Sequence, residues 1–526
     1  MGWESFKFLH PWPARLVEYF SCLAVVVLAC CFLFRELNIF HTNAESARYL
    51  LSALVQSQAS VVAIVVSLTL IAVQLTASAY SPRVVDIFKR NPDLWLLLFF
   101  YGLSMFYGLG VLKLVEAAGG AGGAGGAGGA GGEAVSGSLE FWVSLAFWLG
   151  AFSFVALFPY LWNIFELLKA EEIVKRLAVG ITREKILKAE DNEEEDPILP
   201  VLDVVRSAIM KYDFATTRVG LKAVTERVAE ILGSEGAGKG EEEISKRFCR
   251  HLERVGRLAA SREDEESVWE VIENLEKFGE TTVKRELKKA TENVVLFLGA
   301  VVGAAAEKGL ESGLIKAVYS FEKIGKKAVE KDFSIAVINT TIYLGLIGIT
   351  AVEKGLKRAA QRAGFSLAEI GRIAAAKGHI EEVKEATFLA AKYLGKLGST
   401  AAEKGLEDII LDAMFNLDFV GSTSERNGLE RATKEVVRSF GEIGRKSVEK
   451  GFKNSAESAA FYLTILTLSS EEVVKTAIQD YESMLKEEED RDAFRKFMKI
   501  YKQKLKERRE NLSGLNLLPS KEKKEK

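Results

Sequence analysis

The second long apolar segment of the chain, at residues 50–79, carries polar side chains that a helix facing lipid has no reason to hold. At 100° per residue, one set of these polar positions, extended back through the preceding turns, falls within about 60° of the helix circumference. We name this set the first polar line, and it comprises Glu45, Gln56, Ser60, Ser67, Gln74 and Ser78. Amide and hydroxyl groups arranged in this way favour contact with water, so the line predicts the wall of a pore for ions or solutes.

The opposite side of the same helix carries a second polar line, formed by Gln58, Thr69 and Thr76. We expect this second polar line to pack against neighbouring helices. Leu70 and Ile71 lie on the edges of the first polar line. They would narrow a water path there, and we interpret them as a hydrophobic gate that closes by dewetting.

Two interpretations of the first polar line remain open. In one, its side chains form hydrogen bonds between helices of a single bundle, as Ser, Thr and Gln commonly do in membranes. In the other, they line a pore, and because one helix encloses nothing, this interpretation requires a symmetric homo-oligomer.

Four segments are long and apolar enough to cross a bilayer, which takes about 20 residues in a helix. They span residues 15–34, 50–79, 94–115 and 141–165, so residues 1–168 are predicted to be a transmembrane domain. Five Ala-Gly-Gly triplets, at 118–132, fall in the loop between the third and fourth segments, and we expect a flexible tether there.

The cations flanking the four segments predict their orientation, because Lys and Arg gather on the cytoplasmic side. Arg83, Lys89 and Arg90 lie between the second and third segments, where they would also place positive charge at the inner mouth of a pore. Lys7 precedes the first segment and Lys169 follows the fourth. We therefore expect a multi-pass protein of the plasma membrane with both termini in the cytoplasm.

The stretch Ser60–Arg83, SVVAIVVSLTLIAVQLTASAYSPR, resembles the signature of a large prokaryotic family of predicted polytopic membrane proteins, catalogued as a domain of unknown function. The resemblance extends over about residues 15–115. It implies an integral membrane protein, and it implies no activity, cofactor or catalytic residue.

Charge separates the rest of the chain from this apolar part. Of the 70 Lys and Arg residues 62 lie at 169–526, as do 62 of the 72 Asp and Glu residues. This balance excludes the bulk basic surface that nucleic-acid binding needs. Glu and Lys are abundant and Gln is scarce, a composition typical of thermophiles. Residues 169–200 are predicted to be a helix that continues the fourth segment to about Ala189, followed by a solvated acidic linker at 190–196.

Residues 201–470 repeat with a period of 23, interrupted once by a spacing of 27. The aligned anchor positions are Gly233, Gly256, Gly279, Val302, Gly325, Gly348, Gly371, Gly398, Gly421 and Gly444. Each unit reads as one helix ended by a Lys-Gly pair, with Gly in the left-handed position that stops a helix. About ten such units, stacked as antiparallel pairs, predict a HEAT-like α-solenoid.

Charged helices are expected at 471–485 and 490–509, within a C-terminal region of residues 471–526. The chain shows no phosphate loop, no zinc-protease motif and no nucleophile elbow. We therefore expect an all-α protein without enzyme activity, metal or cofactor. Its predicted function is an oligomeric channel lined by the second span and regulated by the solenoid. The alternative is a membrane-anchored scaffold or receptor whose solenoid binds a partner protein.

Overall fold

A computed structural model describes residues 11–37, 44–79, 85–89, 91–121, 137–189, 195–233, 240–377 and 381–514. None of these residues lies in a β-strand, so the all-α prediction is confirmed over the part of the chain that the structure describes. Contacts divide the chain into two compact units, Met1–Leu177 and Ala178–Lys526.

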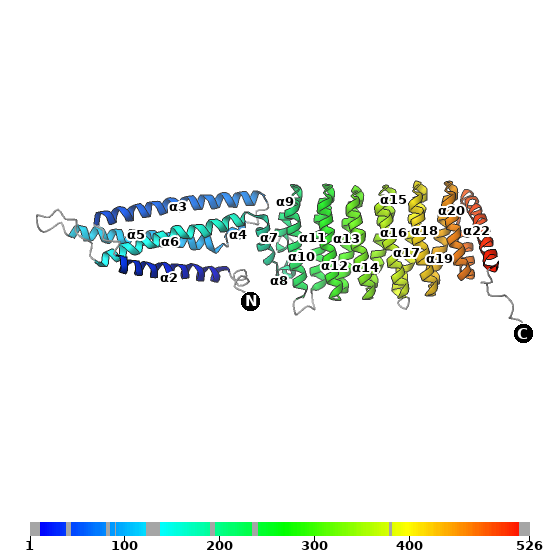
Figure 1. The fold of residues 1–526 in the computed structure, drawn as a ribbon, viewed down its shortest axis with the longest axis horizontal. Coiled ribbons are helices and arrows are strands. Elements are labelled where there is room, and N and C mark those ends of the chain that lie inside the picture. The colour runs from blue at the N-terminus through cyan, green and yellow to red at the C-terminus, as the bar shows by residue number, and fades with distance from the viewer. Residues whose placement is uncertain are drawn as a thin grey trace. The chain divides into compact units, whose positions relative to one another are not determined.

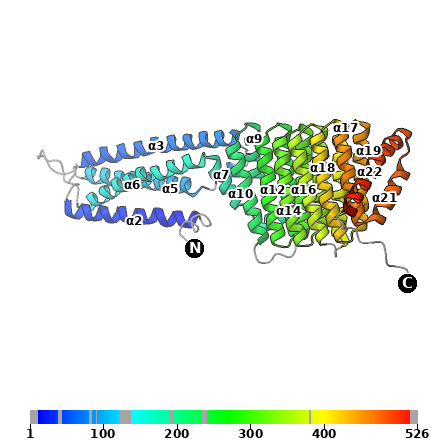
Figure 2. The same ribbon diagram turned by 45° about the vertical axis from the view of Figure 1, so that its right-hand side comes forward.

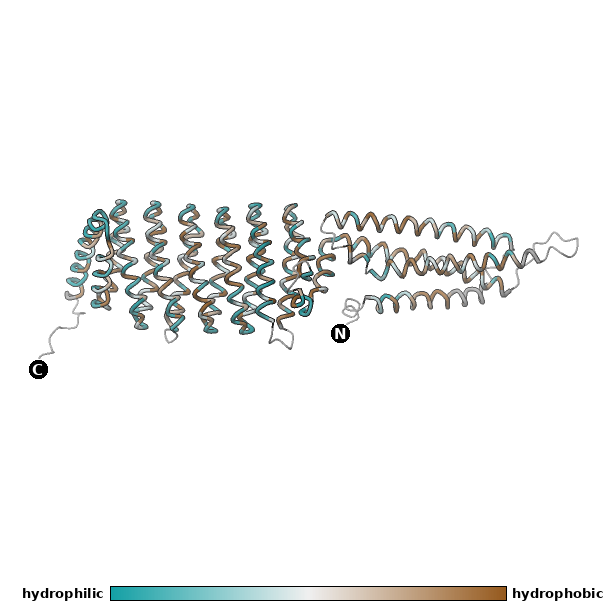
Figure 3. Tube along the Cα trace, turned by 180° about the vertical axis from the view of Figure 1, so that it is seen from behind, coloured by the Kyte–Doolittle hydropathy of each residue, from teal (hydrophilic) through white to brown (hydrophobic). Residues whose placement is uncertain are grey.

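Four long helices build the first unit, and each contains one predicted span. They are α2 (Pro11–Leu37), α3 (Ala44–Ala79), α5 (Pro92–Ala121) and α6 (Gly137–Leu167), with the short α4 (Val85–Lys89) between α3 and α5. Figures 1 and 2 show α5 and α6 lying between α3 and α2, and α3 packs on both α5 and α6. Apolar residues cover most of the four long helices (Figure 3). The Ala-Gly-Gly run is helical as far as Ala121, and residues 122–136 lie outside the described part.

Six of the described helices are long and apolar enough to cross a membrane, by length and composition alone. Four of them are the predicted spans, and the other two, Lys288–Lys308 and Ser334–Glu353, belong to the second unit. In those two helices 56% and 61% of the apolar window is buried inside the protein, against 11–39% in the four predicted spans. Neighbouring helices therefore already cover much of their apolar surface.

The structure corrects two predictions for the segment that follows α6. The expected single helix to Ala189 is broken into α7 (Ala170–Val179) and α8 (Arg183–Lys188), separated by a turn at Gly180. Asp196, expected in a solvated linker, is buried. Its carboxylate accepts a hydrogen bond from the backbone N–H of Ile198 at 2.9 Å and lies 2.9 Å from His251 Nε2. Because these partners satisfy both oxygens of Asp196, the last acid of the predicted linker can be buried in the helical core. Residues 190–194 lie outside the described part.

The second unit is the predicted array of helices. Its members are α9 (Leu199–Met210), α10 (Phe214–Gly233), α11 (Glu241–Ser261), α12 (Glu265–Lys284), α13 (Lys288–Lys308), α14 (Glu311–Glu330), α15 (Ser334–Glu353), α16 (Lys357–Ala376), α17 (Glu381–Lys404), α18 (Glu407–Arg426), α19 (Glu430–Glu449) and α20 (Lys453–Ser469). Each helix packs on the next one and on the next but one. The helices therefore form two layers, an odd layer (α11, α13, α15, α17, α19) and an even layer (α12, α14, α16, α18, α20), seen side by side in Figure 2.

The anchor glycines lie where helices of the two layers approach one another most closely. A Cβ atom built on Gly371 of α16 would lie 2.7 Å from Cβ of Ala390 on α17, which is nearer than two carbon atoms can pack. Ala390 is held by its own helix and has no flexible end to move aside. The contact between α16 and α17 therefore needs a residue without a side chain at position 371.

Turns and the end of the array also follow the predicted pattern. Gly355 and Gly405 adopt φ near +73°, the left-handed conformation expected after the Lys of each unit. The charged C-terminal helices are α21 (Glu471–Met484) and α22 (Glu488–Gly514). They cover the last repeat, where Phe497 of α22 packs against Gly444 and is fully buried. An array whose core is made only from neighbours needs such a cap at its end.

Replacing Gly371 with Ala should destabilise the array by about 1–3 kcal/mol, because the new methyl group overlaps Ala390. The matched control is Gly303→Ala on α13, where a Cβ would meet nothing within 4 Å. That change should stabilise by about 0.5–1 kcal/mol, because Ala is the better helix former. Thermal unfolding of the detergent-solubilised protein, followed by circular dichroism, measures the stability of both variants. Equal midpoints for the two variants would contradict the steric overlap expected at position 371.

Candidate functional site

The first polar line lies on the exposed surface of α3. All six of its side chains, from Glu45 to Ser78, are exposed on the first unit. The hydroxyl of Ser60 donates to the carbonyl of Gln56 at 3.0 Å, and that of Ser78 donates to the carbonyl of Leu75 at 2.9 Å. The side-chain amides of Gln56 and Gln74 have no hydrogen-bond partner among the described residues. The line is therefore not used to pack α3 against its own subunit.

The second polar line behaves as predicted and faces the other helices. Gln58, Thr69 and Thr76 are all buried. The Gln58 amide donates to the Ser104 hydroxyl of α5 at 2.8 Å, and the Thr69 hydroxyl is hydrogen-bonded to the Tyr160 hydroxyl of α6. Hydrogen bonds between helices of one bundle were one of the two interpretations of the first polar line. The structure shows such bonds for the second polar line and none for the first among the described residues.

The predicted gate and the inner mouth are only partly described. Leu70 and Ile71 are 57% and 52% exposed, so they share the open surface of α3 with the first polar line. Lys89, at the end of α4, is also exposed. Arg83 and Arg90 lie outside the described residues. The assignments of pore wall, gate and inner-mouth charge stay predictions.

A buried polar network links the ends of four helices, and the sequence analysis did not single it out. Asp93, at the start of α5, lies 3.1 Å from Nε of Arg15 on α2 and accepts a hydrogen bond from the amide of Asn163 on α6. Arg176 of α7 donates to the carbonyl oxygen of that amide at 3.1 Å. Asp93 and Asn163 are at most 6% exposed. The network therefore ties the helix that leads out of the first unit to three of the apolar helices.

One signal in the sequence could have pointed to this network. Asp93 and Asn163 stand at the ends of otherwise apolar segments, where an ionisable or amide group needs a partner. The sequence could not show which residues are the partners, since Asp93 is more than 70 residues from Arg15 and 70 residues from Asn163.

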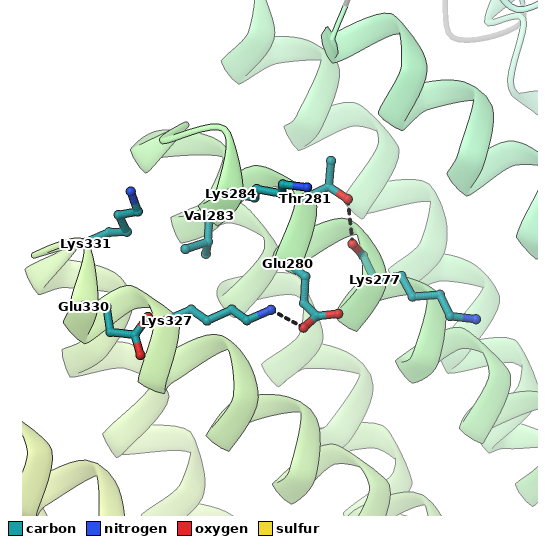
Figure 4. A pocket seen from close by; sticks show the side chains of 8 residues that line it. All are labelled: Lys277, Glu280, Thr281, Val283, Lys284, Lys327, Glu330 and Lys331. Carbon is teal, nitrogen blue, oxygen red and sulfur yellow. Dashed lines mark hydrogen bonds and ion pairs between the residues drawn. The ribbon is translucent and has the colours of Figure 1, made fainter.

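A surface cleft of about 510 Å³ lies at the C-terminal ends of α12 and α14 (Figure 4). Four lysines and two glutamates are among its lining residues, which suggests anion binding at first sight. Lys277 pairs with Glu273 at 3.0 Å, Lys331 pairs with Glu286 at 2.6 Å, and Lys327 pairs with Glu280. Burial alone would raise the pKa of Glu280, but Lys327 and Lys323 outweigh it and hold the pKa below its usual value. Three of the four lysines are therefore already paired with carboxylates, so the cleft makes a weak anion site.

Among the described residues, no three His, Cys, Asp or Glu side chains are grouped as a metal site requires. Cys249 is fully buried, and burial raises the pKa of its thiol well above the usual value. A thiol in this environment is unreactive. The chemistry of the described residues is thus concentrated on α3 and on the polar network.

Residues 14–207 match the model of a family described as "Predicted membrane protein (DUF2254)". The resemblance predicted from Ser60–Arg83 is confirmed, and the match runs past residue 115 to include α7, α8 and most of α9. A solved structure titled "Circular tandem repeat protein with novel repeat topology and enhanced subunit contact surfaces" is 15% identical, with a TM-score of 0.38. The similarity covers 67% of this chain and 92% of that one. No curated protein matches the chain.

Replacing Thr69 with Val should destabilise the first unit by about 1–3 kcal/mol, because the buried hydroxyl of Tyr160 loses its partner. The double variant Thr69→Val with Tyr160→Phe removes both polar groups and should recover most of this loss. The unfolding midpoints of the single and double variants in detergent are compared by thermal unfolding. A double variant no more stable than Thr69→Val would show that the hydrogen bond between α3 and α6 does not hold the helices together.

Proposed function

We propose that this membrane protein is an oligomeric channel for ions or small solutes, whose pore is lined by the first polar line of α3. The observation that carries the proposal is the outward direction of Gln56 and Gln74, whose amides have no partner among the residues of the subunit that the structure describes. These two residues lie within a helix of 35 apolar-rich residues that is long enough to span the bilayer.

Hydrocarbon is a poor environment for an unpartnered amide. Moving such a group from water to an apolar medium without a hydrogen bond costs about 2–7 kcal/mol, depending on the reference state. Gln56 and Gln74 would each carry this cost if they faced lipid. Water in a pore formed by several copies of α3 removes it for every member of the line at once.

Leu70 and Ile71 are the proposed gate, because their large exposed side chains flank the line near Ser67 and Gln74. A ring of such side chains narrows a pore and expels water without any change in charge. Glu45 lies at the other end of the helix from Lys89 and the neighbouring arginines. The proposed orientation places Glu45 at the outer mouth and both termini in the cytoplasm of the cell that holds the protein in its plasma membrane.

Purified protein reconstituted into planar bilayers should conduct, and Ser67→Leu or Gln74→Leu should lower the unitary conductance or abolish it. The reason is that each change puts an isobutyl group into the water path. Ser57→Leu is the matched control, because Ser57 is exposed on α3 but lies about 60° beyond the nearest edge of the line. Its conductance should equal that of the unchanged protein.

No current, or a current that all three variants leave unchanged, would remove the channel proposal. The alternative function, a membrane-anchored scaffold whose array binds a partner protein, needs no oligomer. A mass measurement in detergent separates the two, since a monomer cannot enclose a pore and can still serve as a scaffold.

A further inference from the structure

The outer face of the even layer carries a row of exposed aromatic side chains. Tyr319, Phe365, Phe415 and Phe461 occupy the same position in the successive helices α14, α16, α18 and α20. They are 40–61% exposed. Because packed helices lie about 8–10 Å apart, the row extends over roughly 25–30 Å. Large apolar patches of this kind on a folded protein mark contact surfaces.

Arg362, the cation between the first two rings of the row, is already paired within the subunit. The guanidinium of Arg362 lies 4.1 Å from the ring centre of Tyr319 and 5.1 Å from that of Phe365. It also pairs with Glu322 at 2.6 Å. These contacts hold the two rings in place.

The outer face of the odd layer has a second apolar patch, on α13 and α15. No charged residue occurs in α15 from Ser334 to Val352. Ile335 and Leu346 of this helix and Leu296 of α13 are 46–48% exposed, and Ile342 is partly exposed. The patch lies at the same level of the array as Tyr319 and Phe365, since α13–α16 are consecutive helices, but on the opposite face.

Among the described residues, charged groups without an ion-pair partner occupy the next level of the array, and they have opposite signs on the two faces. One of them, the carboxylate of Asp412, accepts a hydrogen bond from the Gln361 amide at 2.8 Å. Asp412 and Asp418 of α18 have no cation within ion-pairing distance among the described residues. Lys392 and Lys396 are exposed on α17 in the odd layer, and neither has a carboxylate within that distance among the described residues. At the level of α17 and α18 the two faces therefore carry opposite charge, with the two acids of α18 three residues before and after Phe415.

We propose that the arrays of neighbouring copies pack side by side, with the even-layer face of one copy on the odd-layer face of the next. The aromatic row then covers the patch on α13 and α15, and Asp412 and Asp418 approach Lys392 and Lys396. Packing the even-layer face on itself in a parallel register would bring the α18 carboxylates together and leave α15 uncovered. A head-to-tail contact of this kind closes into a ring when its rotation allows. This inference rests on the proposed function, because it names the surface that assembles the oligomeric pore.

Disulfide trapping tests the contact in the full-length protein. The background replaces Cys22, Cys30 and Cys31 with Ala and keeps Cys249, which is fully buried. Phe365→Cys and Ile342→Cys should each remain monomeric on a denaturing gel after mild oxidation, because each cysteine faces a surface that has none. Coexpression of the two variants should give a crosslinked dimer. The double variant should give a ladder that ends at the subunit number.

Glu330→Cys replaces Phe365→Cys in the control, since Glu330 is exposed at the end of α14 and away from the aromatic row. Its combination with Ile342→Cys should not crosslink. Crosslinking of Phe365→Cys with itself would overturn the proposal in favour of a two-fold contact. Absence of crosslinks in a preparation whose mass is oligomeric would overturn it as well.

Charge reversal provides a second measurement on the same contact. Asp412→Lys should lower the oligomeric fraction measured by light scattering, and adding Lys396→Asp should restore it. If the second change does not restore the oligomeric fraction, the proposed pairing of Asp412 with Lys396 is contradicted. Crosslinks in a protein that does not conduct would contradict the pore and support the contact between arrays. Conductance that depends on Ser67, in a protein that does not form these crosslinks, would support the pore and contradict the contact between arrays.

Discussion

Hydrocarbon offers no hydrogen bonds, and this constraint shapes both sides of α3. On one side, the amide and hydroxyl groups of Gln58 and Thr69 find partners on α5 and α6, so the bundle itself satisfies them. On the other side, Gln56 and Gln74 point away from the subunit. A single helix thus separates polar groups that hold the subunit together from polar groups that need something outside it. The proposed pore follows from this difference.

The same constraint acts at the end of the first unit, where the buried Asp93 and Asn163 meet two partly exposed arginines. Arg15, Asp93, Asn163 and Arg176 satisfy one another across α2, α5, α6 and α7. Because removing one partner of a buried charge leaves the other uncompensated, such a network holds its helices in a defined arrangement. The family match includes this whole region and continues through α8 and most of α9. The match therefore includes the segments after the last span as well as the four apolar helices.

In the array, the constraint is steric. Small anchor residues let consecutive helices approach until a methyl group would overlap, as at Gly371 and Ala390. Close approach buries the inner sides of α13 and α15, which are apolar enough by composition to enter a membrane. Their outer sides stay apolar and exposed. An array is stabilised by contacts between neighbouring repeats, so its outer surface is free to be polar. The uncharged outer face of α15 and the aromatic row on the opposite face are therefore not needed for the fold, and we interpret them as contact surfaces.

Most of the helices could be predicted from the sequence alone, although the break between α7 and α8 could not. Segment lengths of about 20 apolar residues and a period of 23 led to the four spans and the helical array, because bilayer thickness and helix geometry translate directly into residue counts. It also separated the two polar lines of α3 by angle. Which of the two lines faces the bundle depends on how the helices pack, since an angle around a helix says nothing about where the neighbours lie. The pairing of Asp93 with Arg15 and of Asp196 with His251 was equally out of reach, because those residues are 78 and 55 positions apart and meet only when the helices pack.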